Sequence, residues 1–166
     1  MFPMQRLDIY LNDHLAGSTL GVELSRRAFA NNRETELGGF LEWLHREIVE
    51  DQSTLVSIMD KLGVDRSPLK PAAAWTLEKL GRLKLNGQIR DYSPLSRLLE
   101  LEALEAGVTG KRSLWDALAT VFPADGRLSD IDFPTLIARA ERQLSGISDH
   151  RRAAAHDAIN GVAQAQ

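Results

Sequence analysis

Residues 36–63 read ELGGFLEWLHREIVEDQSTLVSIMDKLG, and the rest of the chain can be organised around this stretch. Its apolar residues recur every three or four positions, which is the spacing of one face of an amphipathic helix. Thr35 stands before it at the position of an N-cap, and Gly63 follows it as a helix stop. The sequence therefore predicts a helix over residues 36–62.

The apolar stripe of this helix is interrupted at its centre. Asp51 and Gln52 stand between Ile48 and Leu55, where a further apolar residue is expected. A buried carboxylate must be paired or hydrogen-bonded, because an unpaired charge is expensive to remove from water. We expect Asp51 to be either structural, with His14 or Arg112 as its partner, or a metal ligand.

Three more long helices are expected, over residues 3–30, 94–121 and 130–159. Each shows apolar residues at helical spacing. Ser93-Pro94 is an N-cap followed by proline in the first turn, and Ser129 with Asp132 resembles a capping box. At 1.5 Å per residue, each helix spans about 40 Å.

The lengths of the connections select the topology. The links at residues 31–35 and 122–129 are short, whereas residues 64–93 form a long link in which we expect a short helix over 71–80. Short links make neighbouring helices antiparallel, and one long middle link is the ferritin-like arrangement. We therefore expect an all-α four-helix bundle of two hairpin pairs joined by a crossover, forming a single domain over residues 1–166.

Composition excludes several classes of protein. The 166 residues include no cysteine, so disulfides, thiolate metal sites and thiol nucleophiles are ruled out. The net charge of -3 argues against a general nucleic-acid binder. The chain has no P-loop, dinucleotide fingerprint or serine-hydrolase elbow, and no stretch typical of a signal peptide or membrane span. We expect a cytoplasmic protein that binds neither membrane nor nucleic acid, with the basic residues of 79–90 forming a solvated surface.

Three stretches resemble the ferritin-like superfamily, including its small bacterial stress-associated members and the rubrerythrins. They are LAGSTLGVELSRRAF at 15–29, LHREIVEDQSTLVSIMDKLG at 44–63 and SRLLELEALEAGVTG at 96–110. The resemblance implies a bundle whose interior can hold two metal ions. In that family, two helices each supply a Glu and the other two each supply a Glu-x-x-His motif.

The ligand pattern of the family is incomplete in this chain. Ser18 follows Ala-Gly where rubrerythrin-like proteins have Glu, Ser53 replaces the histidine expected three residues after Glu50, and Leu144 stands three residues after Glu141. Only Glu42 and His45 keep the Glu-x-x-His spacing, which places both on one helix face. The full set of candidate ligands is His14, Glu42, His45, Glu50, Asp51, Glu105 and Glu141.

Three functions are consistent with these features. The first, which we expect, is a non-catalytic structural or partner-binding protein without a cofactor, in which Trp75 and leucines of the long link provide a docking surface, including for a homodimer. The second is a redox or stress-response protein with a reduced site for iron, manganese or zinc. The third is a pocket for a small apolar ligand, with room left by Gly17 and Gly21 on one helix and by Gly107 and Gly110 on another.

Overall fold

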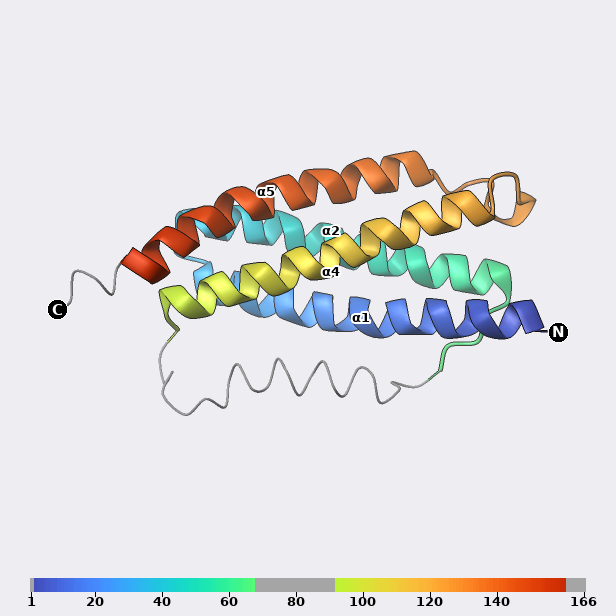
Figure 1. Ribbon diagram of the computed structural model, residues 1–166, viewed down its shortest axis with the longest axis horizontal. Coiled ribbons are helices and arrows are strands. Elements are labelled where there is room, and N and C mark those ends of the chain that lie inside the picture. Colours follow the sequence, from blue (N-terminus) through green and yellow to red (C-terminus); the bar gives the residue numbers. More distant parts are fainter. Residues whose placement is uncertain (1, 68–91, 161–166) are drawn as a thin grey trace.

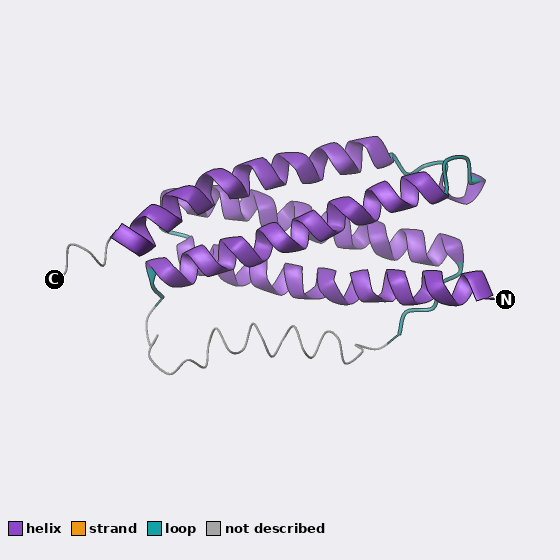
Figure 2. Cartoon of the chain, in the orientation of Figure 1, coloured by secondary structure: helices purple, strands orange, loops and turns teal. Residues whose placement is uncertain are grey.

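The computed structural model describes residues 2–67 and 92–160. Within these ranges there are four long helices and one short 3-10 turn, with no strand (Figures 1 and 2). They are α1 (Phe2–Asn32), α2 (Glu36–Leu62), α4 (Pro94–Val121), η1 (Gly126–Leu128) and α5 (Phe133–Asn160). The prediction of an all-α bundle is confirmed for this part of the chain, whereas the short helix expected at 71–80 lies outside it.

The four helices form a bundle in which every pair of neighbours is antiparallel. α1 lies beside α2 and α4, and α5 lies beside α4 and α2. α1 and α5 run in one direction along the bundle, and α2 and α4 run in the other (Figure 1). The chain therefore leaves α2 at one end of the bundle and enters α4 at the opposite end.

Two buried asparagines of α1 hold the chain at these two ends. Asn12 accepts a hydrogen bond from the backbone N–H of Ser67, at 2.7 Å, just after α2. Asn32 donates to the hydroxyl of Tyr92, at 2.6 Å, just before α4. Because the helix rises 1.5 Å per residue, the two asparagines stand about 30 Å apart along α1.

Apolar packing occurs in two clusters along the bundle. Buried leucines and smaller residues of all four helices form one cluster, and the other surrounds Trp115, which is 1% exposed. On α1, the buried leucines are Leu11, Leu20 and Leu24, whereas Leu7 and Leu15 are only partly buried. Since α1 contacts two helices, more than one of its faces is covered.

The start of the last helix differs from the expectation. α5 begins at Phe133 rather than at residue 130, and the carboxylate of Asp132 caps it by accepting from the N–H of Thr135 at 3.0 Å. Pro134 explains the difference. Proline is tolerated in the first turn but would break a helix that had started four residues earlier.

At the start of α2, Thr35 occupies the expected N-cap position but makes no capping hydrogen bond. Its hydroxyl donates instead to the carbonyl oxygen of Asn32, at 2.8 Å, and so stabilises the turn between α1 and α2.

Candidate functional site

A cluster of polar side chains crosses the middle of the bundle, and Asp51 of α2 is at its centre. Its side chain is 1% exposed. The ammonium group of Lys111, on α4, lies 2.5 Å from one carboxylate oxygen, and Arg139 of α5 lies 3.2 Å from the other. Two cations therefore neutralise this buried carboxylate.

Gln143 connects the same groups from α5. It is fully buried, accepts a hydrogen bond from Lys111 at 2.6 Å, and donates to Glu47 at 2.8 Å and to Asp51 at 3.3 Å. Arg139 also pairs with Glu50 at 3.0 Å. We call these six residues the central polar cluster: Glu47, Glu50, Asp51, Lys111, Arg139 and Gln143.

Burial and charge act in opposite directions on Lys111. Removal from water lowers the pKa of its ammonium group, while attraction to Asp51 and Glu47 partly restores it. An ammonium group has three N–H donors, and two of them are directed to Asp51 and Gln143. One donor of Lys111 therefore has no acceptor among the described residues.

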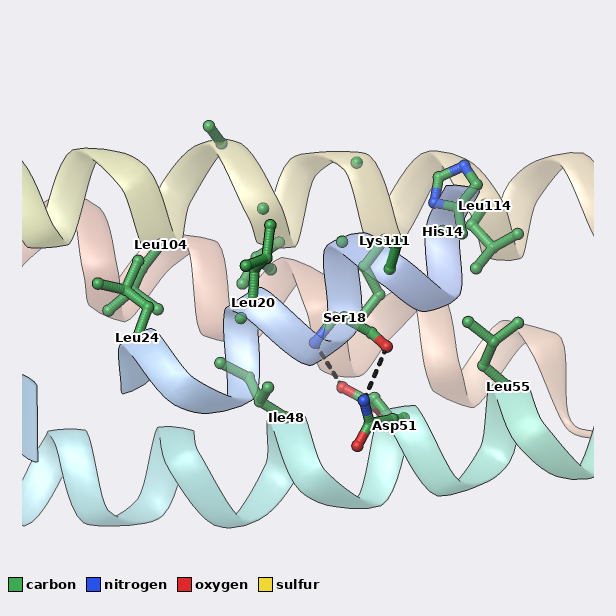
Figure 3. Close-up of a pocket in the computed structure, with 18 of the residues that line it drawn as sticks. His14, Ser18, Leu20, Leu24, Ile48, Asp51, Leu55, Leu104, Lys111 and Leu114 are labelled. Atoms are coloured by element: carbon green, nitrogen blue, oxygen red, sulfur yellow. Dashed lines mark hydrogen bonds and ion pairs between the residues drawn. The ribbon is translucent and has the colours of Figure 1, made fainter. Parts of the chain in front are cut away.

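A cleft of about 650 Å³ lies between α1 and α4, and Asp51 and Lys111 of the central polar cluster are among the residues that line it (Figure 3). Its walls contain small residues from both helices, including Gly17, Ala106, Gly107 and Gly110. A Cβ atom added at any of these three glycines would meet no atom within 4 Å. The small residues therefore leave the space that forms the cleft.

The inner surface of the cleft is mostly apolar. Figure 3 shows the aliphatic side chains that surround the Asp51–Lys111 pair, and they come from three helices. They are Leu20, Leu24, Ile48, Leu55, Leu104 and Leu114. The pair is therefore a polar spot on an otherwise apolar surface.

The other polar residues of the lining include Asp13, which is exposed. Gln52 donates to the hydroxyl of Ser18 at 3.0 Å, and that hydroxyl donates to a backbone carbonyl of α1. His14 packs edge-on against Tyr10, with ring centroids 4.6 Å apart, and burial lowers the pKa of its imidazole. Trp115 also lines the cleft, and its buried indole N–H has no acceptor in the part of the chain that is described.

The metal-ligand candidates do not converge in the described part of the chain. Only His14 and Asp51 line the cleft. His45 is hydrogen-bonded to Ser25 through its Nδ1 atom at 2.9 Å, and Glu42 is exposed.

The three other candidate carboxylates are each paired with an arginine. Glu50 binds Arg139, Glu105 binds Arg151, and Glu141 binds Arg112. Across residues 2–67 and 92–160, no three histidine or carboxylate side chains are grouped so that they could hold a metal ion.

The prediction that His14 or Arg112 pairs with Asp51 is wrong. Neither His14 nor Arg112 binds it, and the residues that do were not identified from the sequence. A signal for two of them was present, because Lys111 stands between Val108 and Trp115 in the apolar stripe of α4. Gln143 interrupts the stripe of α5 in the same way.

No protein-family model, curated protein or solved structure matches this chain. None of the described helices combines the length and apolar character needed to cross a bilayer. The function must therefore be inferred from the cleft and the central polar cluster.

Proposed function

We propose that this protein is a non-catalytic binding protein on a ferritin-like bundle, and that it holds a small, mostly apolar molecule between α1 and α4. The cleft is the observation that carries this proposal. Its volume of about 650 Å³ lies within the usual range for small-molecule sites, roughly 300 to 1,000 Å³. Such sites are typically apolar with a few polar groups, as this cleft is.

The ferritin-like part of the proposal is supported by the order and direction of the helices. All neighbours are antiparallel, and the long link starts and ends at opposite ends of the bundle. An up-down-up-down bundle would need three short links instead, whereas a single long crossover is the ferritin-like solution.

Binding of an apolar molecule is better supported than metal-dependent redox chemistry. A metal ion at Asp51 would have to displace Lys111 and Arg139, which already neutralise the carboxylate. Glu50, Glu105 and Glu141 are likewise bound to arginines. Stoichiometric iron, manganese or zinc in the purified protein, measured by elemental mass spectrometry, would contradict this part of the proposal.

The cleft is also a better candidate than the outer surface for binding. In the described chain, the exposed large apolar side chains are spread over four helices, as Ile9, Tyr10, Val49, Leu95, Val121 and Ile159. Interaction surfaces are normally contiguous apolar patches, whereas single exposed apolar residues are normal on any protein. A homodimer formed through these residues is therefore not part of the proposal.

The test uses the uncharged fluorescent probe N-phenyl-1-naphthylamine, whose emission rises in apolar surroundings. We expect saturable binding of one probe per chain. Gly110→Leu should reduce the affinity at least ten-fold, because the new side chain enters the cleft where no atom lies within 4 Å. The variant should still fold, since leucine is the better helix former by up to about 1 kcal/mol.

Gly39→Leu is the matched control. Gly39 is exposed on α2, outside the cleft, and it also has open space at its Cβ. This variant should bind the probe as the wild type does. Absence of saturable binding, or equal affinity in Gly110→Leu and the wild type, would refute the proposed function.

A further inference from the structure

We propose that the ligand of the cleft is uncharged and carries a carbonyl oxygen, which accepts hydrogen bonds from Lys111 and Trp115. This inference rests on the proposed function and narrows the chemical class of the ligand. Two independent observations carry it: the unused hydrogen-bond donors of the cleft, and the charge balance of the central polar cluster.

The unused donors come from neighbouring positions of α4. Lys111 and Trp115 are four residues apart, so their side chains lie on the same side of the helix, and both line the cleft. Trp115 is 1% exposed, and its N–H has no acceptor among the described residues. A buried donor without an acceptor is unfavourable, and an oxygen atom of a ligand would relieve it.

The acceptors of the Asp51–Lys111 pair, in contrast, are already occupied. Both oxygens of Asp51 accept hydrogen bonds, from Lys111 and Gln143 on one side and from Arg139 on the other. The hydroxyl of Ser18 accepts from Gln52. Beside this pair the cleft therefore offers donors to a ligand, which favours an acceptor group on the part of the ligand that lies there.

The charges around the cleft favour an uncharged ligand. The central polar cluster contains two cations, Lys111 and Arg139, and three carboxylates, Glu47, Glu50 and Asp51. An anionic ligand would bring a fourth negative charge to a cluster that contains only two cations. A cationic ligand would have to compete with Lys111 and Arg139 for Asp51. Beside Asp51 and Lys111, either charge would be removed from water next to groups that are already paired, which is strongly unfavourable.

The test compares four probes with the same ring system, by displacement of N-phenyl-1-naphthylamine. They are 2-acetylnaphthalene, 2-ethylnaphthalene, 2-naphthoate and 2-naphthylmethylammonium. We expect the acetyl compound to bind about ten-fold more tightly than the ethyl compound, which has nearly the same shape but no acceptor. Both charged probes should bind more weakly than the acetyl compound.

Two variants assign the preference to the proposed donors. Trp115→Phe removes the N–H but keeps an aromatic ring, and it should reduce the acetyl-to-ethyl affinity ratio to about three or less. Lys111→Met should reduce this ratio as well. Trp43→Phe is the control, because Trp43 packs against Phe40 and does not line the cleft, and its ratio should remain that of the wild type.

The outcomes separate this inference from the proposed function. Three results would overturn the inference while the cleft remained a binding site. They are equal affinities for the acetyl and ethyl probes, a wild-type acetyl-to-ethyl affinity ratio in both Trp115→Phe and Lys111→Met, and tightest binding of either charged probe. Failure of all four probes and of the fluorescent probe to bind would refute the proposed function itself.

Discussion

Replacing Lys111 by methionine should strongly destabilise the protein, because it removes a charge but leaves its partner buried. The side chains of Lys111 and Asp51 are 15% and 1% exposed, and their charged atoms are 2.5 Å apart. Removal of one partner from a buried ion pair typically lowers the free energy of unfolding by about 3–5 kcal/mol. Since Arg139 still contacts Asp51 at 3.2 Å, we expect the lower end of that range, about 3 kcal/mol.

Urea unfolding followed by circular dichroism at helical wavelengths measures this loss. A loss of about 3 kcal/mol corresponds to a fall of roughly 6–12 °C in the melting temperature for a chain of this size. Lys61→Met is the control, because Lys61 pairs with Asp130 at the surface and its loss should leave the unfolding midpoint unchanged.

The double variant Lys111→Met/Asp51→Leu tests the reason for the loss. Without the carboxylate, no buried charge is left under-neutralised, and an apolar replacement of a buried pair is often neutral or stabilising. We expect the double variant to be more stable than Lys111→Met alone, so the effects of the two substitutions should not add. A loss below about 1 kcal/mol for Lys111→Met, or simple additivity in the double variant, would refute the reasoning.

Three further predictions concern the turn between α1 and α2 and the end of the bundle where α4 begins. Gly38→Ala should lower the free energy of unfolding by about 1–3 kcal/mol, because the added Cβ would lie 2.6 Å from a backbone carbonyl oxygen. Gly39→Ala, whose added Cβ would meet no atom within 4 Å, should be neutral or stabilising in the same urea assay. Equal effects of the two substitutions would contradict this. Burial raises the pKa of Tyr92 to about 12, so its contribution to stability is present below pH 10 and is lost between pH 10 and 12. In a Tyr10→Phe variant, ultraviolet absorbance should show only about a tenth of the remaining phenol ionised at pH 11, and half-ionisation near pH 10 would argue against this environment. Burial also raises the pKa of Glu100 above 4.5, against the opposing hydrogen bonds from Tyr92 and Arg27. The folded state then binds more protons than the unfolded state, so the stability of the wild type relative to Glu100→Gln should fall as the pH rises above about 4.5. An increase in this difference, measured by urea unfolding from pH 4 to 7, would contradict the prediction.

The sequence alone determined the positions of the long helices, because the signals for them are local. Apolar periodicity placed α1, α2 and α4 close to their observed ranges. Gly63 adopts the left-handed conformation expected of a helix stop, with φ of 70°, and Ser93 accepts the N-cap hydrogen bond from Ser96 at 3.1 Å. The start of α5 differs from the prediction although its signal is also local: the capping-box pattern at Ser129 predicts an earlier start, whereas Pro134 fits only a helix that begins next to it.

The tertiary structure alone decided which residues of different helices meet. Asp51 was recognisable as an anomaly in its stripe, but Lys111 and Arg139 lie on other helices, far away in the sequence. Their contact depends on the rotation and the axial offset of each helix in the bundle, which periodicity does not specify. The same holds for the cleft, since the small residues of α1 and α4 form an open space only where the two antiparallel helices bring them to the same level.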